Sequence, residues 1–177
     1  MHPAMLEPDA LLAECTVRRG RAGGPGGQNR NKVETHITLL HGATGMEAQA
    51  GERRSQIENQ RMALRRLRLT LAVEYRTEPV RLRGRAMLAA LDVAEGSALW
   101  RERARGGRIS CNTEHEDFPA ILAEAMDYLA DCGWEPGDAG RRLGVTASQL
   151  VKLLKDHPPA MVKCNGEREG KGKRRLK

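Results

Sequence analysis

Apolar and polar residues alternate through residues 33–40, a spacing typical of a strand that buries one face. The positions that fall together on one side are Val33, Thr35, Ile37 and Leu39. The residues before this strand, 15–18, are extended in character and lead into a glycine-rich loop at residues 20–27. Turn residues at 42–45 follow the strand, so we expect a hairpin whose returning strand begins near Met46.

A short helical turn is expected at residues 8–14, and the clearest helix of the chain begins after Ser55. The Ser55 side chain can cap the backbone, and Glu58, three residues later, can reach back to it as a capping box. Apolar residues then repeat at helical spacing and predict one buried stripe. That stripe is formed by Ile57, Leu64, Leu67 and Leu71, and the arginines expected off it, on a solvated face, are Arg61, Arg65 and Arg68.

Prolines and glycines interrupt an arginine-rich stretch at residues 77–107, which predicts a connector with a helix near residues 85–91. Helical spacing returns over residues 117–133. Two helices joined by a turn are then expected within residues 138–155, which is a helix-turn-helix pattern. Residues 166–177 are basic and glycine-rich with almost nothing apolar, so we expect them to be disordered in isolation.

Together these elements predict an α+β fold in which a small domain is followed by a helical unit. In the first domain, at residues 8–76, a β-hairpin or sheet packs on a helix. A connector at 77–116 leads to a helical, helix-turn-helix-like domain at 117–163. A disordered basic tail at 164–177 completes the expected organisation.

The chain has 177 residues and a formal net charge of +7, from 30 Lys and Arg against 23 Asp and Glu. This excess favours a polyanionic partner, with nucleic acid as the first candidate. No apolar stretch approaches the roughly 20 residues that a membrane span needs, and the N-terminus lacks a basic-then-apolar signal pattern. We therefore expect a soluble, cytoplasmic protein with no membrane partner.

The cysteines are scattered singly, without a Cys-x-x-Cys pair. They are Cys15, Cys111, Cys132 and Cys164. This spacing suggests neither a zinc knuckle nor a disulfide framework, so the cysteines are interpreted as ordinary thiols. No metal and no cofactor is expected.

The glycine-rich loop does not fit the common phosphate-binding motifs. A Walker-type loop needs Gly-Lys followed by Ser or Thr, but Lys32 follows Asn31 and precedes Val33. A dinucleotide-binding fingerprint leads from strand through loop to helix, whereas this loop leads into a strand. The chain also lacks the Gly-x-Ser-x-Gly elbow of a self-sufficient hydrolase, and His36 and His41 are interpreted as structural.

The run Gly-Gly-Pro-Gly-Gly-Gln-Asn-Arg-Asn-Lys-Val-Glu-Thr at residues 23–35 resembles the signature of the class I peptide chain release factor family. Residues 52–56, Glu-Arg-Arg-Ser-Gln, and 63–67, Ala-Leu-Arg-Arg-Leu, resemble the helix that follows the hairpin in that family. The resemblance covers about residues 10–75, with the motifs in the expected order and spacing. It identifies the first domain as a GGQ domain.

The resemblance implies that Gly26, Gly27 and Gln28 are the catalytic residues for hydrolysis of the peptidyl-tRNA ester. In this family the backbone N–H of the glutamine helps to stabilise the transition state, and its side chain helps to admit water and exclude larger nucleophiles. Glycines allow the backbone to approach the tRNA terminus without a side chain in the way. The chain would be a carboxylic ester hydrolase only in the ribosomal peptidyl transferase centre, with the ribosome supplying most of the active site.

Cations flank both the loop and the tail and are candidates for neutralising RNA phosphates without reading sequence. Those around the loop are Arg18, Arg19, Arg21, Arg30 and Lys32. Those of the tail are Arg168, Lys171, Lys173, Arg174, Arg175 and Lys177. The expected partners are large-subunit ribosomal RNA and peptidyl-tRNA, bound by a monomer.

The length leaves no room for a separate codon-recognition region, so the chain looks similar to the short, codon-independent branch typified by alternative ribosome-rescue factor B. Rescue factors of that type end in a basic tail that lies in the empty mRNA channel. The substrate, an intact stalled ribosome or a split large subunit, stays open, as do helper proteins, methylation of Gln28 and the role of the helical domain. The alternative function is a helix-turn-helix protein that binds DNA, although Lys152, Lys155 and Gln149 offer little base readout.

Overall fold

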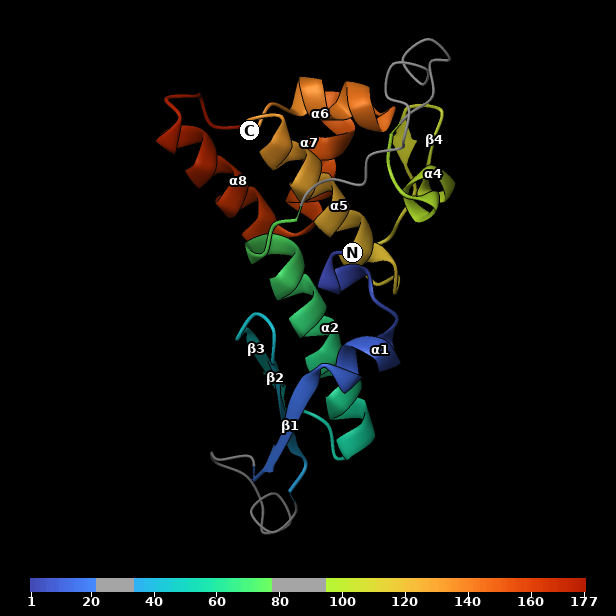
Figure 1. Ribbon diagram of the computed structural model, residues 1–177, viewed down its shortest axis with the longest axis vertical. Coiled ribbons are helices and arrows are strands. Elements are labelled where there is room, and N and C mark those ends of the chain that lie inside the picture. Colours follow the sequence, from blue (N-terminus) through green and yellow to red (C-terminus); the bar gives the residue numbers. More distant parts are fainter. Residues whose placement is uncertain (22–33, 78–94) are drawn as a thin grey trace.

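The computed structural model describes residues 1–21, 34–77 and 95–177. The helices are the 3-10 turn η1 (Pro3–Met5), α1 (Pro8–Ala13), α2 (Gln56–Glu74), α4 (Ala98–Arg103), α5 (Phe118–Asp131), α6 (Pro136–Leu143), α7 (Ala147–Asp156) and α8 (Pro158–Gly170). The strands are β1 (Cys15–Gly20), β2 (His36–His41), β3 (Glu47–Ala50), β4 (Ala104–Arg105) and β5 (Arg108–Ile109). Figure 1 shows the β1–β3 sheet at one end of the long axis, α6 and α7 at the other, and α2 between them.

The sheet is antiparallel, with β2 in the centre and β1 and β3 on its two sides. Gly20 at the end of β1 pairs with His36 at the start of β2. Ile37 and Leu39 of β2 are buried, and α2 packs on β2 and β3. The alternation expected at Ile37 and Leu39 and the hairpin are therefore confirmed, whereas Thr35 precedes β2 and Val33 lies outside the described residues.

Helix α2 follows its sequence pattern over most of its length. Ser55 is the N-cap, and its hydroxyl accepts a hydrogen bond from the backbone N–H of Glu58 at 3.4 Å. The buried positions include Asn59, Ala63, Leu67 and Leu71, which lie four residues apart. Ile57 precedes this row by two residues and so lies about 200° around the helix from Asn59. Its side chain is 65% exposed, and the expectation that it belongs to the apolar stripe is wrong.

The arginines expected on a solvated face of α2 behave differently from one another. Arg61 is exposed, as expected. Arg68 is buried, and its guanidinium donates to the carbonyl of Ala4 at 3.1 Å and to that of Glu116 at 3.0 Å. Arg65 is half-buried and donates to carbonyls of residues 113–115. The N-terminal segment and the turn before α5 cover this face, which helical spacing alone could not reveal.

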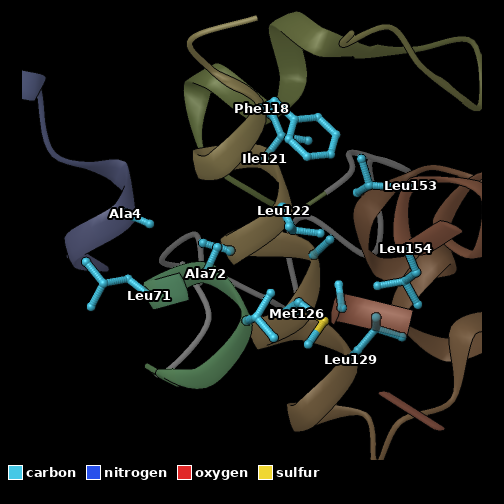
Figure 2. Packing of buried hydrophobic residues seen from close by; sticks show 14 of the residues in the cluster. Ala4, Leu71, Ala72, Phe118, Ile121, Leu122, Met126, Leu129, Leu153 and Leu154 are labelled. Atoms are coloured by element: carbon cyan, nitrogen blue, oxygen red, sulfur yellow. The ribbon is translucent and has the colours of Figure 1, made fainter. Parts of the chain in front are cut away.

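Helix α5 joins the two ends of the molecule. Every residue from Phe118 to Leu129 is buried, which is typical of a helix surrounded by packed elements. Figure 2 shows its Leu122 and Met126 side chains between Ala72 of α2 and Leu154 of α7. The buried side chains of the sheet, α2 and the C-terminal helices consequently form one cluster.

Two buried carboxylates of α5 fasten the chain on either side of residues 78–94. Asp127 accepts hydrogen bonds from Arg76 and from the backbone N–H of Thr77, each at 3.1 Å. Glu124 accepts from the backbone N–H and the hydroxyl of Ser97 at 2.5 and 2.6 Å, and burial raises the pKa of this carboxyl. The helix expected near residues 85–91 lies outside the described residues.

The helix-turn-helix expected at residues 138–155 is present as α6 and α7. Gly144 ends α6 in the left-handed conformation, with φ of 67°. Thr146 then caps α7 by accepting from the backbone N–H of Gln149 at 3.3 Å. The local signals at this turn, a glycine at the helix end and a threonine cap, account for the success of the prediction.

The expectation that residues 164–177 form a disordered tail is wrong. They continue α8 and then fold back on the helical unit. Asn165 holds this return, because its side chain accepts from the backbone N–H of Leu176 at 2.7 Å. Lys173 donates to the carbonyl of Gly133 at 2.8 Å and pairs with Glu135 at 2.7 Å.

Arg168 is the buried centre of this arrangement, with 7% of its surface exposed. Its Nε donates to the carbonyl of Arg174 at 2.9 Å, and its Nη1 donates to that of Trp134. A burial of this kind requires partners for the charge, and the backbone carbonyls supply them. The basic composition suggested disorder because such cations are usually solvated. Here Arg168 and Lys173 instead bind groups of the fold and hold the segment in place.

We expect Gly140→Ala to destabilise the protein by about 1–3 kcal/mol, because a Cβ there would lie 2.6 Å from the carbonyl oxygen of Val145. Gly137→Ala is the matched control on the same helix, since a Cβ there meets nothing within 4 Å, and a small gain is expected from helix propensity. Urea denaturation measures both. Equal unfolding free energies for the two variants would contradict the close α6–α7 contact.

Candidate functional site

The strands β1 and β2 carry the glycine-rich loop between them. Because Gly20 pairs with His36, the chain leaves β1 and re-enters β2 at the same end of the sheet. Figure 1 shows that this end faces away from α6 and α7. Gly26, Gly27, Gln28, Arg30 and Lys32 lie outside the described residues, so their roles stay predictions.

Asn59 of α2 fixes the chain where it returns from the loop. Its side chain is fully buried, and its Nδ2 donates to the carbonyl of Thr35 at 2.6 Å and to that of Arg53 at 2.9 Å. Its Oδ1 accepts from the backbone N–H of Arg53 at 2.9 Å. Gln56, one turn earlier, donates to the carbonyl of Glu34. The first turns of α2 therefore hold the loop exit by two side-chain amides.

Sequence reasoning missed Asn59, although the chain carried a signal for it. Asn59 lies four residues before Ala63 and eight before Leu67, in the same row as the buried positions of α2. A buried amide in such a row needs hydrogen-bond partners, and extended backbone next to a loop offers free carbonyls.

A weaker contact also spans the loop ends, where Arg21 Nε lies 3.8 Å from Glu34 Oε1 with both side chains exposed.

The two histidines near the loop in sequence have structural surroundings. His41 is fully buried at the end of β2 remote from the loop, with its ring nitrogens 2.7 Å from Thr44 Oγ1 and 3.0 Å from Glu14 Oε2. The His36 ring packs closely on the backbone of Gly51, where an added Cβ would lie 2.6 Å from His36 Cδ2. These contacts support the interpretation of both histidines as structural residues.

Strand β1 presents cations close to the loop. Arg18 and Arg19 are exposed, and neither forms an ion pair within the described part of the chain. Because β1 is an edge strand, its outer side has no neighbouring strand. Successive side chains of a strand point to opposite faces, so the two arginines extend to both sides of this edge. Both are available to a polyanion that approaches the loop.

The predicted cations of residues 164–177 divide into two groups. Arg168, Lys173 and Arg175 are paired within the fold, the last with Glu169 at 3.3 Å. Lys171, Arg174 and Lys177 are exposed and have no ion pair among the residues that the structure covers. Strand β1, which carries Arg18 and Arg19, and the C-terminal segment lie at opposite ends of the molecule (Figure 1). The structure therefore does not gather the predicted set at one site.

Residues 11–103 match the family model described as the RF-1 domain. This match includes the loop, the sheet and α2. The chain belongs to the RF-1 domain family, the class I release factor GGQ-domain family. The identification agrees with the motif at residues 23–35, which carries the Gly-Gly-Gln sequence.

Curated proteins with related sequences carry the names of peptide chain release factors or of a release factor-like protein. The chain is 44% identical over 138 residues to peptide chain release factor 1 of Symbiobacterium thermophilum, which covers 73% of this chain and 38% of that protein. It is 47% identical over 73 residues to the chloroplast release factor PrfB1 of Arabidopsis thaliana, and this alignment covers 39% of this chain and 16% of that protein. A mitochondrial release factor-like protein of Saccharomyces cerevisiae is 39% identical over 72 residues, and this alignment covers 40% of this chain and 46% of that protein. The chain thus spans less than half the length of each of these relatives.

The described ranges contain neither a metal-binding cluster nor a membrane-spanning helix. Among residues 1–21, 34–77 and 95–177, no group of three or more His, Cys, Asp or Glu residues could hold a metal ion. The cysteines are free thiols, with Cys164 buried and the others half-buried. None of the described helices combines the length and apolar character needed to cross a membrane.

We expect Asn59→Ala to lower the free energy of unfolding by about 1–3 kcal/mol, because it leaves backbone groups of Thr35 and Arg53 without their partners. Arg61→Ala on the exposed side of the same helix is the control and should change stability by less than about 0.5 kcal/mol. Chemical denaturation of the two variants tests this. A loss no larger for Asn59→Ala than for Arg61→Ala would refute the positioning role.

Proposed function

We propose that this protein hydrolyses the ester of peptidyl-tRNA in the large subunit of the ribosome, with Gly26, Gly27 and Gln28 at the reacting ester. The observation that carries the proposal is the Gly-Gly-Gln sequence on a loop between two paired strands of an RF-1 domain. The release factor names of the related proteins agree with it. Within the chain, the GGQ domain is assigned to residues 8–76, the connector to 77–116 and the helical domain to 117–163.

The proposed chemistry explains why the loop carries these residue types. Attack of water on the ester builds negative charge on the carbonyl oxygen, which a fixed backbone N–H at Gln28 would stabilise. Gly26 and Gly27 let the backbone approach the tRNA terminus closely. The histidines of β2 are held by structural contacts, so the proposal takes the remaining catalytic groups from ribosomal RNA and tRNA. Arg18 and Arg19 would neutralise phosphates beside the loop.

We also propose that release is codon-independent and serves the rescue of ribosomes. Beyond residue 103, where the RF-1 domain match ends, the described residues form the strands β4 and β5 and helices that pack on α2 and on one another. The proposal assigns no codon reading to them. Because residues 171–177 are folded onto the helical unit, it does not include insertion of a free tail into the mRNA channel.

The alternative function, a regulator that reads DNA sequence, is weakened by one contact. In a helix-turn-helix protein the second helix reads base edges, and Gln149 is the best candidate for that on α7. Its side-chain Oε1 instead accepts a hydrogen bond from the backbone N–H of Ile109 at 3.1 Å. The amide oxygen is therefore engaged in holding β5 on α7.

Gln28→Ala and Gly27→Ala should each abolish peptide release while leaving ribosome binding nearly intact, because binding is distributed over many cations. Gly20→Ala is the control glycine, since a Cβ there meets nothing within 4 Å and should leave release unchanged. The measurement is release of labelled peptide from purified ribosomes, with co-sedimentation for binding. Normal release by Gly27→Ala would contradict the proposed mechanism, because a methyl group there should obstruct the close approach of the backbone to the tRNA terminus.

Release should proceed at similar rates whether the decoding site holds no codon, a sense codon or a stop codon. The same release assay, run on ribosomes with truncated and with full-length messages, measures this directly. Activity restricted to stop codons would show that the protein decodes, and would leave the hydrolysis proposal standing while removing the rescue proposal.

A further inference from the structure

A groove lies on the helical unit, at the end of the molecule opposite the loop. It has a volume of about 520 Å³ and runs between the start of α6, the outer side of α7 and the last residues of the chain. Ser148, Val151, Lys152 and Lys155 of α7 line one wall, and Leu176 and Lys177 line the facing one. Residues far apart in the sequence therefore form one continuous concave surface.

The charge of this groove is positive. Lys152, Lys155 and Lys177 are exposed, and no ion pair joins them to other residues that the structure covers. Glu135 is the acidic side chain in the groove lining, but ion pairs with Lys173 and Arg168 balance its charge. The Lys173 ammonium hydrogen-bonds it and lowers the pKa of its carboxyl, and Arg168 adds a second contact at 3.4 Å. Lys152 and Lys155 thus set the field in the groove, which suits an anion.

The wall that carries Lys177 is built into the fold. Arg168 is buried beneath it and binds the backbone carbonyls of Trp134 and Arg174. Asn165 holds Leu176 through both its amide atoms, by donating to the carbonyl at 3.3 Å and accepting from the N–H at 2.7 Å. A preformed surface loses less conformational entropy on binding than a free basic tail does.

The residue types in the groove distinguish among nucleic acids. Single strands are bound by stacking bases on aromatic rings, and none of the described residues lining the groove is aromatic. Base edges of a duplex are read by Arg, Asn or Gln, but the α7 residues that line the groove are Ala147, Ser148, Val151, Lys152 and Lys155. Gln149 of the same helix is held by Ile109. What remains is contact between ammonium groups and the phosphates of a double helix.

We propose that the groove between α7 and the C-terminal segment binds the phosphate backbone of double-helical RNA. The choice of RNA over DNA rests on the proposed function at the ribosome, whereas the groove itself is independent of the chemistry at the loop. The two ends of the molecule then hold different RNA elements: the loop reaches the peptidyl-tRNA ester while the groove fixes the helical unit on an RNA helix. This assigns the helical domain a docking role and explains why its basic segment is folded.

The test measures binding of the full-length protein to a fluorescent RNA duplex of about 20 base pairs by anisotropy, across a salt series. Lys152→Glu with Lys155→Glu should weaken binding at least tenfold and reduce the slope of log K against log salt by about two. The matched control, Arg54→Glu with Arg61→Glu, makes the same charge change at two exposed residues without ion pairs in the described chain. It lies near the sheet, at the other end of α2, and should keep affinity within about threefold because salt screens distant charges.

Several outcomes would overturn the proposal. Unchanged affinity and salt slope in the α7 variant would remove the groove as the site, and so would an equal loss in the control variant. Binding as tight to a DNA duplex or to single-stranded RNA of the same sequence would remove the assignment to RNA helices. Lys152→Gln with Lys155→Gln, checked by thermal denaturation, separates lost binding from lost folding and should give a smaller loss of affinity.

The assay also distinguishes this inference from the proposed function. Gln28→Ala should bind the RNA duplex as the unmodified protein does, even though it fails to release peptide. If the unmodified protein binds the duplex through α7 but releases no peptide from ribosomes, the hydrolysis proposal falls and the groove stands. If the unmodified protein releases peptide but the α7 variant binds the duplex normally, the hydrolysis proposal stands and the groove is removed as the RNA site.

Discussion

Helix α2 packs against the sheet and against α5, with the sheet beside the start of the helix and α5 beyond its end (Figure 1). The row that runs from Asn59 through Ala63 and Leu67 to Leu71 faces both partners in turn. Each fully buried leucine contributes about 1.5–3 kcal/mol relative to an exposed one. Arg68 completes the contact by binding carbonyls of the N-terminal segment and of the turn before α5. The helix therefore sets the distance between the loop at one end and the helix-turn-helix at the other.

Helix α2 and its neighbour α5 hold the chain at the borders of residues 22–33 and 78–94, which lie outside the described residues. Asn59 binds the carbonyl of Thr35, just after the glycine-rich loop, from the first turns of α2. On α5, Asp127 and Glu124 bind Thr77 and Ser97, before and after residues 78–94. In each case a buried polar side chain is satisfied by backbone at the edge of the segment, which fixes where that segment departs.

The net positive charge of the chain is divided between structure and surface. Arg65, Arg68, Arg168 and Lys173 bind carbonyls or carboxylates within the fold, so they are not free to meet a polyanion. The exposed, unpaired cations of the described chain that concern function are those of β1, those of the groove, and Lys171 and Arg174. A count of basic residues therefore overstates the nucleic-acid surface, and their contacts show which positions carry it.

The sequence by itself determined the features that depend on residues close together in the chain: the alternating strand around Ile37, the caps at Ser55 and Thr146, and the Gly-Gly-Gln motif. These rest on side-chain alternation, on hydrogen bonds spanning three residues and on a short motif, so local pattern suffices. The tertiary structure decided which polar groups are buried. Arg68 donates a hydrogen bond to the carbonyl of Ala4, 64 residues away in the sequence, and Arg168 donates one to the carbonyl of Trp134, 34 residues away. No local sequence pattern can identify such partners. Because burying a charge is favourable only when such partners exist, the order of the basic C-terminal segment could be decided only once the chain had folded around it.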